Sequence, residues 1–160
     1  MGKFFVMSTR FDKCNASDFG LIEEDMNTGI SPKDGSIWKR TSLYDFGWGK
    51  ENGFYKTPLP NFEKLFEIAL YSKNSDDMYG AAAVILDRFP DELLYQCELY
   101  LNEDDRKSEI VRLINLFKLK LATNRCAIAG KTYRQIEQDF RRWKKISEVA
   151  KETEDRGRFA

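Results

Sequence analysis

The sequence contains no histidine, and this absence removes several classes of reactive centre. Ser-His-Asp triads, Cys-His pairs and His-ligated zinc sites all need an imidazole. The three cysteines, Cys14, Cys97 and Cys126, are too few for a zinc site of four thiolates. Acid–base chemistry would fall to Asp, Glu, Lys, Tyr or Cys. We therefore predict a protein that is not an enzyme, with no catalytic residues, no cofactor and no metal.

Long apolar runs are also missing. The longest covers residues 81–86, whereas a membrane-spanning helix needs about 20 apolar residues. The apolar stretch near the N-terminus covers only residues 4–7, against roughly 7–15 for the core of a signal peptide. The cysteines are odd in number and far apart, which suits unpaired thiols in a reducing compartment. We expect a cytoplasmic protein without a membrane partner.

The two parts of the chain differ in amino-acid composition and in hydrophobic periodicity. Residues 1–57 are rich in Gly, Ser, Asn, Asp and aromatic residues and show no helical period. We expect an irregular N-terminal segment with short strands at residues 4–8 and 36–42, which can pair with each other. Residues 58–155 are predicted to form a helical body. The fold class is therefore expected to be mainly α, with about five antiparallel-packed helices in a single domain covering residues 1–160.

Helix starts in the second part carry local signals. Asn61 precedes apolar residues at helical spacing, and proline is favourable in the first turn of a helix. Threonine followed three residues later by glutamine is a capping box. The predicted caps or first residues are Asn61, Ser75, Pro90, Asn102 and Thr132, the last paired with Gln135.

An aromatic stretch at residues 43–60 lies between the two parts. It holds five aromatic residues and three glycines within a short polar run. Rings of this size bury a large area each, so we favour a role in pinning the N-terminal segment across the helices. The alternative is a lip that faces a partner, because tyrosine and tryptophan are common interface anchors. Trp48 and Tyr55 are the candidates for that role.

Charge is segregated along the chain although it cancels overall. Residues 74–105 carry nine acids and one base, and residues 106–145 carry twelve bases and three acids. Neighbouring helices of opposite sign can attract each other, or the acidic segment can face a basic partner. The predicted partner-binding residues are Asp76, Asp77, Asp91, Glu92, Glu98, Trp48 and Tyr55.

Residues 77–101 resemble one helical hairpin of a HEAT-like repeat, with a small run at residues 81–83 and Pro90 opening the second helix. In its size, its lack of catalytic groups and its acidic segment, the chain resembles small bacterial toxin-immunity proteins. That resemblance implies a non-catalytic protein-binding module that inhibits a toxin by occlusion. It also implies a basic protein as the partner.

Two alternatives belong to other functional classes. The first is a nucleic-acid-binding protein, although Tyr133, Phe140 and Trp143 are predicted to fall mostly on the inward face of the last helix rather than to be free for stacking. The second is a metal-dependent enzyme in which Asp91, Asp105 and Lys107 converge. The nucleic-acid alternative uses Arg134, Arg141, Arg142, Lys144 and Lys145.

Overall fold

The computed structural model describes residues 2–7, 15–45, 50–103 and 105–158. The chain divides into two compact units, Met1–Val84 and Ile85–Ala160. The boundary falls inside helix α2 (Ser75–Arg88), so the predicted HEAT-like hairpin at residues 77–101 is not contained in one unit. The prediction of a single domain stays a prediction, and each unit is described by itself.

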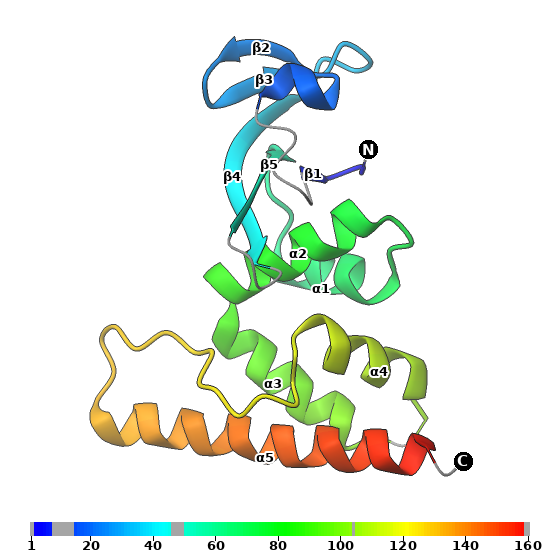
Figure 1. Cartoon of the computed structure of the whole chain (residues 1–160). Coiled ribbons are helices and arrows are strands. Elements are labelled where there is room, and N and C mark those ends of the chain that lie inside the picture. Colours follow the sequence, from blue (N-terminus) through cyan, green and yellow to red (C-terminus); the bar gives the residue numbers. More distant parts are fainter. Residues whose placement is uncertain (1, 8–14, 46–49, 104, 159–160) are drawn as a thin grey trace. The chain divides into compact units, whose positions relative to one another are not determined.

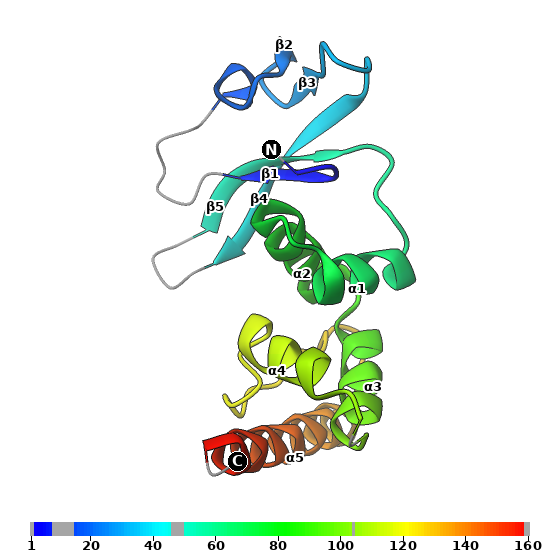
Figure 2. The ribbon, with the colours of Figure 1, turned by 90° about the vertical axis from the view of Figure 1, so that its right-hand side faces the viewer.

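The first unit contains a five-stranded antiparallel sheet with the order β1-β5-β4-β3-β2 (Figures 1 and 2). The fold is therefore mixed α and β. The expectation of about five helices agrees with α1 to α5 of the described chain, whereas the mainly α class is corrected, because the N-terminal segment expected to be irregular or short-β forms a five-stranded sheet. The strands are β1 (Phe5–Met7), β2 (Ile22–Asp25), β3 (Thr28–Ile30), β4 (Ile37–Asp45) and β5 (Lys50–Lys56).

Strands β1 and β4 occupy the two segments predicted as strands, but they do not pair with each other. β5 lies between them, because Tyr55 faces Phe5 on one side and Lys39 on the other. β5 comes from the aromatic stretch, where the sequence showed turn residues rather than a strand pattern. Residues 43–45 and 50–56 of the aromatic stretch are therefore part of the sheet.

One face of this sheet carries an apolar cluster. Phe54 of β5 is fully buried, and its ring meets that of Phe19 edge-on, with 5.9 Å between centroids. Phe19 ends a short 3-10 helix, η1 (Ala16–Phe19). Phe54 thus has the pinning role expected of the aromatic stretch, but within the sheet. The cluster consists of Val6, Ala16, Phe19, Leu21, Trp38 and Phe54.

Helices α1 (Phe62–Tyr71) and α2 also belong to the first unit, the latter up to Val84. Asn61 caps α1 as predicted, since its side chain accepts a hydrogen bond from the Lys64 amide at 3.0 Å. The side chain that caps α2 is that of Asn74, which accepts from the Asp77 amide at 3.0 Å. The predicted cap, Ser75, is instead the first helical residue.

Gly80 lets α2 approach the sheet closely. A Cβ atom at this position would lie only 2.3 Å from Cγ of Phe5. Phe5 is itself fully buried. Gly80 directly precedes the small run at residues 81–83, in which Ala81 and Ala82 are also fully buried.

The second unit contains α3 (Pro90–Leu101), α4 (Lys107–Leu116) and α5 (Tyr133–Arg158). The long helix α5, orange to red in Figure 1, packs against α3. Its predicted capping box is confirmed, because the Gln135 amide donates to Thr132 Oγ1 at 3.2 Å and the Thr132 amide to Gln135 Oε1 at 2.9 Å. Trp143, a residue of α5, is fully buried. The guanidinium group of Arg125 lies over its ring, with Cζ 4.7 Å from the ring centroid.

Helix α4 begins later than predicted. Asn102 does not open α4 but ends α3, since its side-chain amide donates to the Glu98 carbonyl at 2.7 Å. α4 starts at Lys107, after Arg106. Glu103 and Asp105 precede the helix, and Lys118 and Lys120 follow its end.

No helix in the described parts of the chain combines the length and the apolar character that a membrane crossing requires.

Candidate functional site

Helix α3 brings three of the predicted partner-binding acids together. Asp91 and Glu92 lie in its first turn, and Glu98 lies two turns later. The buried side of the helix is formed by Leu93, Leu94 and Cys97, each at most 1 % exposed. On the opposite side two large apolar side chains face solvent, Tyr95 at 57 % and Leu99 at 43 % exposed.

Glu92, Tyr95 and Leu99 follow the i, i+3, i+7 spacing of a single helix face. We refer to these three residues as the α3 outer face. Glu92 is exposed and forms no ion pair with any residue that the structure describes. The face therefore combines one free carboxylate with an aromatic and an aliphatic side chain.

Glu98, at the edge of this face, is neutralised by α5. Arg142 donates from Nε to both Glu98 carboxylate oxygens at 3.2 Å and from Nη2 to Oε1. The hydrogen bonds that the Arg142 guanidinium donates to Glu98 raise its pKa above the usual value. The opposite charges of the two segments thus attract each other within the second unit, as one of the two sequence interpretations expected.

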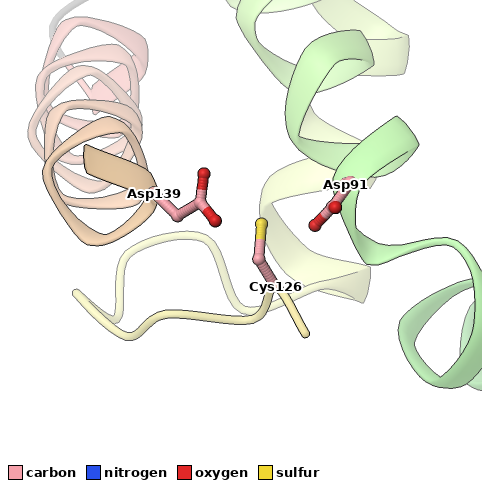
Figure 3. A group of neighbouring side chains, drawn as sticks. All are labelled: Asp91, Cys126 and Asp139. Carbon is pink, nitrogen blue, oxygen red and sulfur yellow. The ribbon is translucent and has the colours of Figure 1, made fainter. Parts of the chain in front are cut away.

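Asp91 belongs to a hydrogen-bonded network with residues of the segment before α5 and of α5 itself (Figure 3). Lys131 Nζ lies 2.7 Å from Asp139 Oδ2 and 3.1 Å from both carboxylate oxygens of Asp91. Cys126 lies between the two carboxylates, and the ligand-type atoms of the three residues are within 4.8 Å of one another. Trp143 Nε1 donates to Cys126 Sγ at 3.2 Å.

The protonation states follow from these contacts. The Cys126 hydrogen bond, followed by that of Lys131, holds the pKa of Asp91 below its usual value. Burial, followed by the hydrogen bond to Asp91, raises the pKa of the Cys126 thiol to about 12. The hydrogen bond to Asp139 raises the pKa of Lys131. At neutral pH the network is therefore a thiol and an ammonium group between two carboxylates.

This network is better suited to holding the chain together than to chemistry. A cysteine acts as a nucleophile or a metal ligand in its thiolate form, which the raised pKa disfavours. Lys131 already places a positive charge between Asp91 and Asp139, where a cation would have to bind. The network joins the start of α3, the segment before α5 and the first turns of α5.

The residues of the metal-enzyme alternative do not converge. α3 has 12 residues and is therefore about 18 Å long. Asp91 lies in its first turn, whereas Asp105 and Lys107 follow its end. Asp105 is also exposed. The partners that Asp91 does meet, Cys126, Lys131 and Asp139, were not predicted, because they are brought together only by the packing of α5 on α3.

The predicted partner-binding residues of the first unit are scattered. Asp77 is 3 % exposed, and its carboxylate accepts hydrogen bonds from the backbone amides of Lys3, Phe4 and Phe5 at 2.8–2.9 Å. Its place on a partner surface is therefore corrected to a structural role. Asp76 is half-buried near the start of α2, and Tyr55 is half-buried in β5.

Trp48, the remaining predicted partner-binding residue, lies outside the described residues.

The five basic residues of the nucleic-acid alternative are all exposed on α5, but two of them form ion pairs. Arg142 is bound to Glu98. Arg134, Lys144 and Lys145 are exposed and form no ion pair within the described ranges, and Arg141 pairs with Glu137, four residues earlier on the same helix, at 2.8 Å. That pair is largely exposed, at 72 % and 61 %, and contributes little.

Two of the aromatic residues near these bases are not where the sequence predicted them. Trp143 is buried, as expected, but Tyr133 is 94 % and Phe140 39 % exposed. The exposed positions on α3 were missed as well. Tyr95 and Leu99 are four residues apart and lie off the stripe formed by Leu93, Leu94 and Cys97, so a helical wheel of α3 would have identified them.

Comparisons with known proteins give no guide to this site: no family model, no curated protein and no solved structure matches the chain.

Proposed function

We propose that the chain is a non-catalytic protein-binding module that docks a partner on the α3 outer face. The observation that carries this proposal is the exposure of Tyr95 and Leu99, one helical turn apart, beside the free carboxylate of Glu92. Aromatic side chains at the centre of a patch, with polar residues around them, are typical of interface hot spots. A protein with an apolar pocket and a basic rim fits this arrangement.

An inhibitor of the toxin-immunity type is the specific form of this function that we favour. Such a protein acts by covering its target, so it needs a surface and no reactive group. The raised pKa of Cys126 and the internal pairing of Asp91 support a role without chemistry. Glu92, which forms no ion pair within the described part of the chain, would attract a basic target and speed its encounter.

Site-specific photo-crosslinking followed by measured affinity tests the proposal. A benzophenone amino acid at position 95 is expected to capture one protein in cells, and the same group at position 133 is not expected to capture it. The captured protein is then purified and titrated by calorimetry against the wild type and the double variant Tyr95→Ala/Leu99→Ala. We expect the double variant to bind at least about thirtyfold more weakly, equivalent to about 2 kcal/mol.

Tyr133→Ala is the matched control, because it removes an even more exposed tyrosine from the same unit. It is expected to bind the captured protein as the wild type does. Equal affinity of the wild type and the double variant would reject the α3 outer face as the docking surface. Inhibition of a toxic activity of the captured protein would identify the inhibitor form of the function.

A further inference from the structure

A second surface, on α5, has the chemistry of a nucleic-acid-binding site. It lies in the first half of the helix, where four basic side chains stay exposed and two aromatic rings reach solvent. We call the bases the α5 basic face. Its members are Arg134, Arg141, Lys144 and Lys145.

Helical spacing places the two rings at the edge of this face. Tyr133 and Phe140 are seven residues apart, which puts them on one side of the helix about 10 Å apart. Lys144 follows Phe140 by four residues and therefore lies in line with the rings. Tyr133, at 94 % exposed, contributes almost nothing to the packing of its own unit.

Ion pairs with α3 distinguish two other bases of this region from the α5 basic face. Arg142 and Lys131 are held by carboxylates of α3, and they are not available to a ligand. The bases of the α5 basic face keep their charge in solvent, and Glu137 is the nearest acid on that side of the helix, with Arg141 as its partner. A positive net charge therefore remains beside the rings.

We propose that the first half of α5 binds single-stranded nucleic acid. The α5 basic face contacts phosphates, and Tyr133 and Phe140 stack on unpaired bases. Single strands are favoured over duplexes because the faces of paired bases are not accessible to the rings, whereas those of a single strand are. This surface goes beyond the protein-binding function of α3 and uses different residues, so either proposal can fail without the other.

Fluorescence anisotropy with the full chain tests this proposal. The probes are fluorescein-labelled 20-nucleotide oligomers of deoxythymidine and of uridine, titrated between about 20 and 200 mM salt. Four phosphate contacts on a single strand predict a slope of about −3 for log affinity against log salt. We expect Arg134→Glu/Lys145→Glu to weaken binding at least tenfold and to halve this slope.

The control double variant is Lys33→Glu/Lys107→Glu, which changes the net charge by the same amount at two exposed lysines that are not part of α5. It is expected to keep the affinity within about threefold of the wild type. Tyr133→Ala is expected to weaken binding about fivefold or more without changing the salt slope, because stacking is not an ionic contact.

Three results would overturn the proposal. The first is that no oligonucleotide binds at the lowest salt concentration. The second is that the control double variant loses as much affinity as Arg134→Glu/Lys145→Glu. The third is that duplex and single strand bind with equal affinity and that Tyr133→Ala does not change this affinity. Binding of poly-glutamate but not of the oligonucleotides would also overturn it and would point to an acidic protein as the ligand of α5.

Discussion

A single buried carboxylate connects the N-terminal strand to the start of α2. Asp77 accepts hydrogen bonds from three consecutive backbone amides, those of Lys3, Phe4 and Phe5. Asn74 in turn accepts from the amide of Asp77 itself. The sequence places Asp77 in the first turn of α2, where an acid is favourable. It did not predict that this acid is buried, because its three donors lie more than 70 residues earlier in the chain.

Replacing Asp77 is expected to destabilise the first unit. Asp77→Ala leaves three backbone N–H groups without their acceptor, and each hydrogen bond to a charged group is worth about 1.5–3 kcal/mol. Because the N-terminal strand can move to regain water, we expect a loss of about 3 kcal/mol or more in the free energy of unfolding. Urea denaturation followed by circular dichroism measures it.

Glu63→Ala is the matched control for this change. Glu63 is an acid in the first turn of α1, but it is exposed. Its loss is expected to cost less than about 1 kcal/mol, the usual size of a charge–dipole contribution. If both variants lost the same stability, the dipole and not the three hydrogen bonds would explain the role of Asp77.

At the scale of elements, local signals predicted the helices whose starts depend on a few neighbouring residues. Asn61 and the pair of Thr132 and Gln135 cap their helices as expected, because a cap is satisfied within three residues of chain. Asn102 was misassigned because asparagine is favourable at both ends of a helix. Its side chain turned back to the Glu98 carbonyl.

The sheet could not be read from the sequence in the same way. Strand β2 is exposed along its whole length, so it has no buried alternation to reveal it. β5 contains glycine and follows turn residues, and it is a strand because β1 and β4 pair with it on both sides. Pairing partners far apart in the chain decide such strands, and propensity alone does not.

The candidate surfaces show the same limit. Asp91, Glu92 and Glu98 were predicted together because they share one helix. Asp91 and Glu98 form ion pairs with Lys131 and Arg142, and these pairs depend on how α5 packs on α3. The sequence shows the acids and the bases, but it does not show which of them lie close together in the fold. The exposure of Tyr133 and Phe140 was missed because the sequence does not show how much of the apolar side of α5 the rest of its unit covers.

The capping box of α5 offers a test at this scale. Thr132→Ala removes the acceptor of the Gln135 amide and is expected to cost about 1 kcal/mol of unfolding free energy. Thr132→Ser keeps a hydroxyl and is expected to stay close to the wild type. Urea denaturation of both variants measures the difference. A Thr132→Ala protein as stable as the wild type would mean that the box does not contribute to the stability of α5.

At the scale of the whole chain, the charged residues that the sequence separates into two blocks are partly recombined. The acids of α3 meet bases of α5 and of the segment before it, and this uses charges that could otherwise have attracted a partner. The α3 outer face keeps one unpaired acid beside two exposed apolar side chains, and the first half of α5 keeps four exposed bases beside two exposed rings. Each surface therefore has an excess of one sign of charge and its own apolar anchors, and this is why we assign them different ligands.

From the same packing we expect the cysteines of the second unit to be unreactive, and this can be measured on the whole molecule. Cys97 and Cys126 are both buried, and burial raises the pKa of each thiol to about 12 from an ordinary value of 9.0. A difference of about three pKa units lowers the thiolate population about a thousandfold at pH 8. In a Cys14→Ser protein, Ellman's reagent is expected to react at least about a hundredfold more slowly in buffer than in urea, where both thiols are released.

Asp91→Asn removes the carboxylate that accepts from Cys126, and it should speed the reaction of that thiol while Cys97 stays slow. Prompt reaction of either thiol in the folded Cys14→Ser protein would contradict the protonated, hydrogen-bonded state of the network, and with it the view that this cluster holds the second unit together rather than acting on a substrate.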